Sequence, residues 1–161
     1  MNLTSDSVRR RISIQNGNTK HIPASAKTLT KEKKKPEYKP FQVGLYKDLR
    51  GKLEDYDAHH VVQKALGKLF IKGYDGDYAP VILVPKVGHT KKEEIHERGI
   101  VSRNTKGFSS IDEVLLRDIN ELLRVYPSIP VESIEELIKL NKKMYIELQS
   151  FSFDTDNIKR A

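Results

Sequence analysis

The chain has 161 residues, which suits one domain or one domain with an appendage, and its 32% of charged residues predict that part of it is a solvated arm. A formal net charge of +7 favours an anionic partner such as nucleic acid, an acidic protein or an anionic membrane face. The chain has no cysteine, which excludes disulfides, cysteine-ligated zinc and thiol catalysis.

Residues 1–40 are polar and basic, and we expect a basic, partly extended arm or linker there. Its stretch "ISIQNG" alternates and could add one short strand before a turn. The later stretch "KTLTKEKKKPEYKP" holds six lysines, which indicates either a solvated linker or an arm that lies on phosphates. The first residues lack the apolar core of a secretory signal, and no apolar run reaches the length of a membrane span.

The middle of the chain, residues 41–108, has the composition of a compact domain with short elements. The stretch "HHVVQ" (59–63) is β-branched and predicts a strand, and residues 64–73 follow with helical spacing. The stretch "VILVPK" (81–86) predicts a short buried strand, and 90–99 predict a short helix with Thr90 as its N-cap.

The last part, residues 109–161, is predicted to be helical. Ser110 with Glu113, and Ser133 with Glu136, are spaced as capping boxes that open two amphipathic helices. A short proline-flanked loop joins the helices, so we expect an antiparallel pair packed on a small core.

Two adjacent histidines, His59 and His60, are the most distinctive local feature. Consecutive side chains on a strand point to opposite faces, so the two imidazoles can have different functions. A neutral imidazole is a common metal ligand, and a pKa near 6.5 also suits a general base. His89 and His96 lie seven residues apart, about 10 Å along a helix, which is too far for one metal ion. We therefore expect His89 to be the second ligand and His96 to contact either phosphate or one of the residues that bind the metal.

Further polar residues lie close to these histidines in the sequence. Asp57 is two residues before His59, so a strand places both on one face and Asp57 could also reach the metal. Basic residues surround His89 in the sequence and could bind phosphate or form a solvated helix face: Lys86, Lys91, Lys92, Arg98 and Arg103.

The segments "YDAHHVVQ" and "APVILVPKVGHTKKEEIH" resemble the HNH/endonuclease VII superfamily of nucleases, also called His-Me finger or ββα-metal nucleases. The resemblance is strongest to the x-His-His toxin branch of bacterial polymorphic toxins and covers roughly residues 43–125. It implies an α+β fold, with a small ββα-metal core at residues 41–108 and the helical pair at 109–161 packed on it.

The resemblance also implies residue roles. His59 and His89 correspond to metal ligands, and His60 corresponds to the general base that activates water. The metal is expected to be a divalent ion, Mg²⁺ first, with Mn²⁺, Ni²⁺ or Zn²⁺ as alternatives. The middle asparagine of the family motif has no clear match, and Asp77 is a possible substitute.

The expected function is therefore hydrolysis of phosphodiester bonds, with DNA favoured over RNA, by a toxin module. Such a module would be delivered as part of a larger secreted bacterial protein and act in the target-cell cytoplasm, opposed by an acidic immunity protein and without membrane binding. The alternative is a non-catalytic basic module that binds nucleic acid or protein, and a metal-free ribonuclease is a third possibility.

Overall fold

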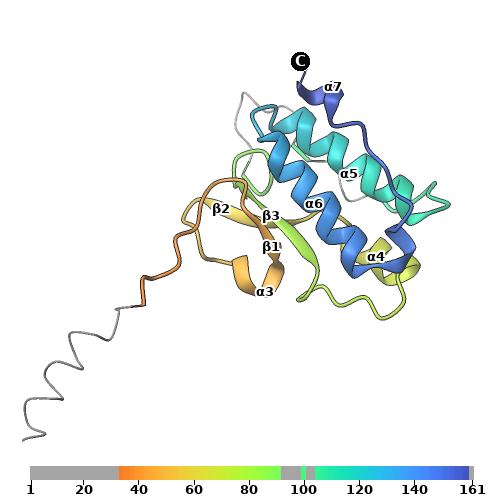
Figure 1. The fold of residues 1–161 in the computed structure, drawn as a ribbon, viewed down its shortest axis with the longest axis horizontal. Helices are drawn as coiled ribbons and strands as arrows, with labels where there is room; N and C mark the ends of the chain where they lie inside the picture. The colour runs from red at the N-terminus through yellow and green to blue at the C-terminus, as the bar shows by residue number, and fades with distance from the viewer. Residues whose placement is uncertain (1–32, 92–98, 101–103, 160–161) are drawn as a thin grey trace, which may run out of the picture. The chain divides into compact units, whose positions relative to one another are not determined.

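The computed structural model describes residues 33–91, 99–100 and 104–159 (Figure 1). The chain divides into two units, residues 1–37 and residues 38–161, and the following account concerns the second. The strand expected at "ISIQNG" and the basic residues up to position 32 lie outside the described residues.

A three-stranded antiparallel sheet has the order β1-β3-β2 and consists of β1 (Val43–Leu45), β2 (Tyr56–His60) and β3 (Pro80–Pro85). The central strand β3 is buried almost throughout, which explains its continuous apolar sequence "VILV". Within the described residues, β2 pairs only with β3 and forms an edge of the sheet.

The pairing register separates the two histidines. His59 is opposite Ile82, and His60 is opposite Val81. Residues directly opposite each other in an antiparallel pair lie on the same face of the sheet. Ile82 belongs to the main core with the long helices, whereas Val81 packs on the other face with Leu49. The prediction that the two imidazoles point apart is therefore confirmed.

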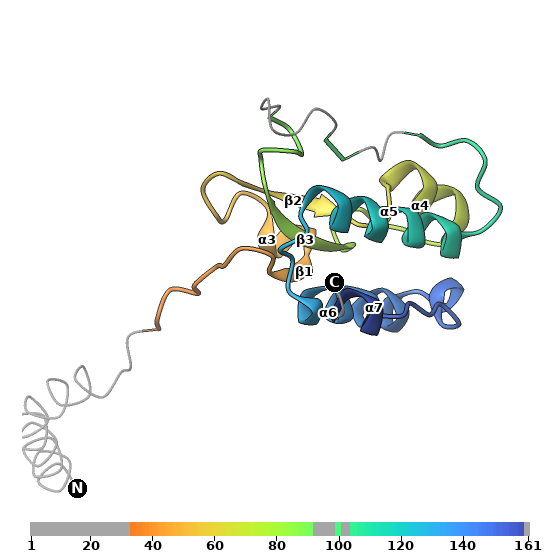
Figure 2. The ribbon, with the colours of Figure 1, turned by 90° about the horizontal axis from the view of Figure 1, so that it is seen from above.

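The helices within the described residues are α3 (Tyr46–Leu49), α4 (Lys64–Phe70), α5 (Ile111–Val125), α6 (Val131–Met144) and α7 (Asp156–Lys159), with a 3-10 turn at Ile146–Leu148. Helices α5 and α6 run in opposite directions (Figure 1). Helix α6 lies against β1 and β3, and α5 lies beside α4. Figure 2 shows α4 and α5 above α6 and α7. None of the helices in the described part of the chain has the length and apolarity to cross a membrane.

The helix starts agree in part with the sequence. Ser110 is the N-cap of α5, and its hydroxyl accepts a hydrogen bond from the Glu113 backbone N–H. The Glu113 carboxylate accepts from Ser109 rather than from Ser110, so the reciprocal half of the capping box is shifted by one residue. Helix α6 begins at Val131, after Pro130, and so starts before Ser133, the N-cap expected from the sequence.

The α+β class is confirmed, with a small antiparallel sheet and helices. Residues 38–161 form one compact unit, so the helices at 109–161 share the main core with the strands. The helix expected at 90–99, which would complete a ββα motif, lies mostly at residues 92–98, outside the described residues.

Candidate functional site

Asp57, His89 and Thr90 form a hydrogen-bonded cluster at the edge strand. His89 donates from Nδ1 to Asp57 Oδ2 at 2.9 Å, and the Thr90 hydroxyl donates to the same oxygen at 2.6 Å. Burial alone would raise the pKa of Asp57, but the bonds from Thr90 and His89 lower it below its ordinary value. Asp57 is therefore an anion, and its contact with Nδ1 leaves the lone pair of a neutral His89 on Nε2.

His59 lies beside this cluster in the interior. Its ring centroid is 5.0 Å from that of His89, in an edge-on arrangement. Its side chain is buried, and its Nε2 atom has no hydrogen-bond partner among the described residues. Burial, followed by the nearby His89 and His60, lowers the pKa of His59 to about 3. His59 is thus neutral at physiological pH, which is the form of imidazole that binds a metal ion.

His60 lies on the opposite face of the sheet. Its ring centroid is 4.5 Å from that of Tyr46, and its Nε2 lies 2.8 Å from the Gly76 carbonyl oxygen. A carbonyl oxygen only accepts, so Nε2 carries the proton and Nδ1 carries the lone pair of the neutral ring. Burial lowers the pKa of His60 below its ordinary value. The role of His60 as general base stays a prediction, and its acceptor atom would be Nδ1.

A cleft of about 560 Å³ lies along β2 and receives side chains from both faces of the sheet. Asp57 and His89 line it from one face, and Tyr46 and Ala58 line it from the other. A cleft with this lining is possible because β2 is an edge strand. A substrate in the cleft would therefore pass close to the residues of both faces.

The charges in the cleft are mixed. Arg50 and Lys86 supply two positive charges, while Glu54, Asp55 and Asp57 supply three negative charges. The cleft alone is therefore not basic, and phosphate affinity must come in part from the surface around it. Arg50 and Tyr46 are not among the residues predicted from the sequence. Their spacing of four residues is compatible with one side of a helix, but a helix of four residues is too short for this spacing to form a recognisable pattern.

The other sequence-predicted substrate residues have different outcomes. Lys86 lines the cleft, whereas Lys91 is exposed just after Thr90. Lys92, His96, Arg98 and Arg103 lie outside the described residues. Asp77, the suggested substitute for the missing asparagine, is exposed near His60, and its backbone oxygen accepts from the Lys47 N–H.

The donor set fits a divalent metal ion in its chemistry. The rings of His59 and His89 are adjacent, the Nε2 atom of His59 has no hydrogen-bond partner, and a carboxylate that braces one ring is a common arrangement behind metal-binding histidines. Asp57 would orient the His89 ring through Oδ2, and the direct ligand role expected for Asp57 from the sequence stays a prediction. Within the described segments, no set of three His, Cys, Asp or Glu side chains is arranged to hold a metal ion, so water or substrate would supply further ligands. Imidazole ligands favour Zn²⁺ or Ni²⁺ over Mg²⁺.

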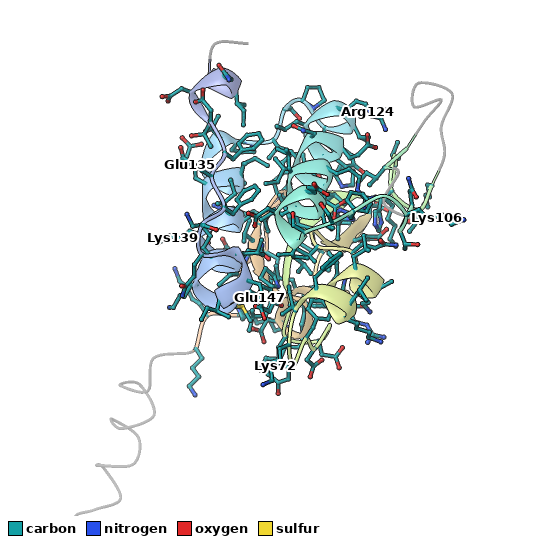
Figure 3. The ribbon with its side chains drawn as sticks, turned by 90° about the vertical axis from the view of Figure 1, so that its right-hand side faces the viewer. Lys72, Lys106, Arg124, Glu135, Lys139 and Glu147 are labelled. Atoms are coloured by element: carbon teal, nitrogen blue, oxygen red, sulfur yellow. The ribbon has the colours of Figure 1, made fainter. Side chains whose placement is uncertain are left out.

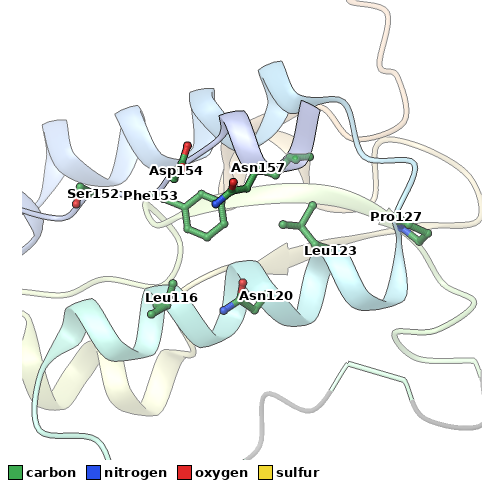
Figure 4. A pocket seen from close by; sticks show the side chains of 9 residues that line it. Leu116, Asn120, Leu123, Pro127, Ser152, Phe153, Asp154 and Asn157 are labelled. Carbon is green, nitrogen blue, oxygen red and sulfur yellow. The ribbon is translucent and has the colours of Figure 1, made fainter. Parts of the chain in front are cut away.

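A second cavity lies away from the histidines. It has a volume of about 630 Å³ and is enclosed by α5 and the segment from Ser152 to Ile158 (Figure 4). Phe153 and Leu123 give it an apolar lining, and Asp154 is its ionisable side chain. No histidine, lysine or arginine is among its lining residues, so we place the candidate site at the cleft along β2.

Comparison with known proteins gives no relative: no family model, curated protein or solved structure matches the chain.

Proposed function

We propose that this chain is a metal-dependent endonuclease that hydrolyses phosphodiester bonds, with DNA as the favoured substrate. One observation carries the proposal: the unpartnered Nε2 of buried His59 lies beside His89, which Asp57 holds by Nδ1. A buried nitrogen without a partner costs free energy in the apo protein, and a bound ion would remove that cost.

Each residue of the site would have a separate role in hydrolysis. His59 and His89 would present Nε2 atoms, and Asp57 and Thr90 would fix the orientation of the His89 ring. His60 would accept the proton of the attacking water at Nδ1, with its Nε2–H held by Gly76. His60 lies on the other face of the sheet and, like His59, does not line the cleft, but its ring contacts Tyr46, which does. The scissile phosphate would therefore lie at the edge of β2, next to Tyr46.

A bound divalent ion would stabilise the negative charge on the phosphate and leaving oxygen. His59 is buried whereas His89 lines the cleft, so the site would be shielded from water on the His59 side and open to substrate on the His89 side.

The biological role proposed for this activity is that of an antibacterial toxin module, delivered within a larger secreted protein and opposed by an acidic immunity protein. The support is the net charge of +7, which favours acidic partners, together with the sequence resemblance. The matching genetic observation would be a small acidic reading frame directly downstream.

The test is incubation of the purified chain with plasmid DNA and with RNA in Mg²⁺, Mn²⁺, Ni²⁺ or Zn²⁺, each with an EDTA control. We expect metal-dependent nicking of plasmid that EDTA abolishes. Circular single-stranded DNA is tested in the same way, and intact plasmid, single-stranded DNA and RNA in every metal would reject the enzyme. Calorimetry without metal uptake, with retained nucleic-acid binding, would instead favour the non-catalytic binding module.

A metal-free ribonuclease is the second candidate, and the Asp57–His89 hydrogen bond favours it. A carboxylate that orients an imidazole is sufficient for general base catalysis on a ribose 2′-hydroxyl, without a metal ion. RNA cleavage that persists in EDTA while DNA stays intact would identify this activity.

A further inference from the structure

A surface beside the cleft combines aromatic rings with cations. Tyr46 has the Arg50 guanidinium carbon 5.7 Å from its ring centroid and the Lys64 ammonium at 4.9 Å. The Lys47 ammonium lies 4.6 Å from the ring centroid of Tyr78. We call Tyr46, Lys47, Arg50, Lys64 and Tyr78 the tyrosine–lysine surface.

Backbone contacts join these residues into one continuous structure. The Tyr46 N–H donates to the Ala79 carbonyl at 3.0 Å, and the Lys47 N–H donates to the Asp77 carbonyl at 2.8 Å. Helix α3 is thereby held against the loop that carries Tyr78. A Cβ built on Gly76 would lie 3.2 Å from Lys64 Cε, so the Lys64 side chain passes closely along the same loop.

The surface continues directly into the cleft. Tyr46 and Arg50 line the cleft together with His89, and they also belong to the tyrosine–lysine surface. The cleft itself carries more acidic than basic side chains, so a polyanion that reaches His89 needs cations next to it. Lys47, Arg50 and Lys64 are exposed and adjacent, and they supply these charges.

The exposure of Tyr78 favours single-stranded nucleic acid over a duplex as the ligand of this surface. Tyr78 is 51% exposed, so part of its ring is open to solvent. An exposed ring with a cation on it can stack with a nucleobase, and stacking needs a base whose face is free of its neighbours. The neighbouring Asp77 is exposed and negative, which disfavours a phosphate at this point and favours a base.

We propose that the tyrosine–lysine surface binds a single strand of nucleic acid and leads it into the cleft at β2. Phosphates bind Lys47, Arg50 and Lys64, and one base stacks on Tyr78. This inference rests on the proposed function, because it names the substrate class of the same site. The low aromatic content of the chain, 7%, would by itself favour contact with the backbone of a duplex. The inference departs from that expectation because of the position of Tyr78.

The experiment measures binding in EDTA, so that cleavage does not enter the result. Fluorescein-labelled oligothymidylate, oligouridylate and an oligothymidylate–oligoadenylate duplex are titrated with the full chain over a salt series. We expect tighter binding of both single strands than of the duplex, and the ratio between thymidylate and uridylate reports DNA against RNA. Equal or tighter binding of the duplex would overturn the proposal.

Two sets of variants locate the surface. Tyr78→Ser should weaken single-strand binding about tenfold with no effect on the duplex. The triple change Lys47→Gln, Arg50→Gln and Lys64→Gln should reduce the slope of log K against log salt by about 2, since each single-strand phosphate contact contributes about 0.7. If the triple variant has a lowered melting temperature, the three single variants replace it in the binding measurement.

The matched controls are Lys106→Gln and Lys139→Gln. Both lysines are exposed, neither lines the cleft, and Figure 3 shows them on opposite sides of the view. Controls that lose as much salt dependence as the surface variants would overturn the proposal. If wild-type protein cleaves nucleic acid but the surface variants bind normally, the inference alone fails. If the surface variants lose binding but no condition gives cleavage, the proposed function alone fails.

Discussion

His89 and Asp57 are joined by a hydrogen bond of 2.9 Å although 32 residues separate them in the sequence. The bond fixes which His89 nitrogen is protonated, and it leaves Nε2 directed away from the carboxylate. The position of one ring in the candidate site therefore depends on a side chain that need not touch the metal or the substrate.

Asp57→Asn tests this dependence. Asparagine keeps the size of the side chain but removes the charge, so we expect a 10- to 100-fold loss of metal affinity, the order typical of a brace behind a metal-binding histidine. Calorimetry with Zn²⁺ and Ni²⁺ measures the change. Asp55→Asn is the matched control, because Asp55 lines the same cleft without a bond to His89. Equal affinities of the wild type and Asp57→Asn would reject the positioning role.

His59→Leu separates metal binding from folding. Leucine removes a buried nitrogen that has no partner, so the metal-free variant should unfold at the same temperature as the wild type or higher. The variant should also lose the rise in melting temperature that metal gives the wild type. A variant that metal still stabilises fully would show that His59 is not a ligand.

A pair of variants distinguishes the two possible roles of His60. His60→Ala removes both the proton acceptor and the bond to Gly76, so loss of activity alone does not decide between them. Asparagine at this position can still donate to the Gly76 carbonyl but cannot act as a base near neutral pH. We expect both variants to lose most of the hydrolysis, and the residual rate to lose the rise with pH on the acid side that a deprotonated base produces. Normal activity of His60→Asn would make His60 a positioning residue for the loop.

Leu115 and Leu116 give a matched test of the core. Leu115 is 0% exposed within the main core, whereas Leu116, the next residue on α5, is 43% exposed. Leu115→Ala should lower the free energy of unfolding by about 3 kcal/mol, and Leu116→Ala by less than about 1 kcal/mol. Urea titration measures both. Similar losses in the two variants would contradict the assignment of this face of α5 to the core.

Asp118 provides a pH test away from the cleft. It is buried, and it accepts from Arg117 Nε at 2.8 Å and from the Gln63 N–H at 3.2 Å. Burial raises the pKa of Asp118 to about 7, although Arg117 opposes the rise. A folded pKa above the unfolded value contributes stability that is complete below about pH 4 and is lost as the pH rises through about 7.

The expected effect of Asp118→Asn follows from this loss of stability as the pH rises. Relative to the variant, the wild type should lose up to about 4 kcal/mol of unfolding free energy between about pH 4 and about pH 7. Urea titration at several pH values gives this difference, with other titrating groups common to both proteins. Parallel stability curves for the two proteins would show that Asp118 does not titrate in this range.

The sequence predicted features that depend on local pattern. The amphipathic pattern of α5 and the opposite directions of His59 and His60 were predicted from periodicity, and the N-cap Ser110 was predicted from its spacing to Glu113. All three agree with the structure. The strand expected at 59–63 is displaced to Tyr56–His60. Val61 and Val62 are buried rather than paired, because β-branched residues indicate burial as well as strand pairing.

The sequence could not show which distant residues meet. Asp57 was selected for its face, but its bond to His89 depends on the turn after β3, which no pattern at either residue specifies. Arg50 and Tyr46 were missed because their helix has only four residues, too few to show a periodic stripe. The metal-ligand role expected for Asp57 came from its position on the strand and stays a prediction, while its hydrogen bond to His89 adds a possible positioning role that the sequence did not indicate.

The register of β2 on β3 makes the site sensitive to chain length. Asp57 pairs with Val84 and His59 with Ile82, so a single residue inserted in the turn before Tyr56 could shift the strand by one position. Such a slip would turn both side chains to the face of α3 and bring Ala58 and His60 against the long helices. The composition would hardly change, yet the candidate centre would lose its two β2 residues at once. Length variation between Arg50 and Tyr56 should therefore be far less tolerated than substitution there.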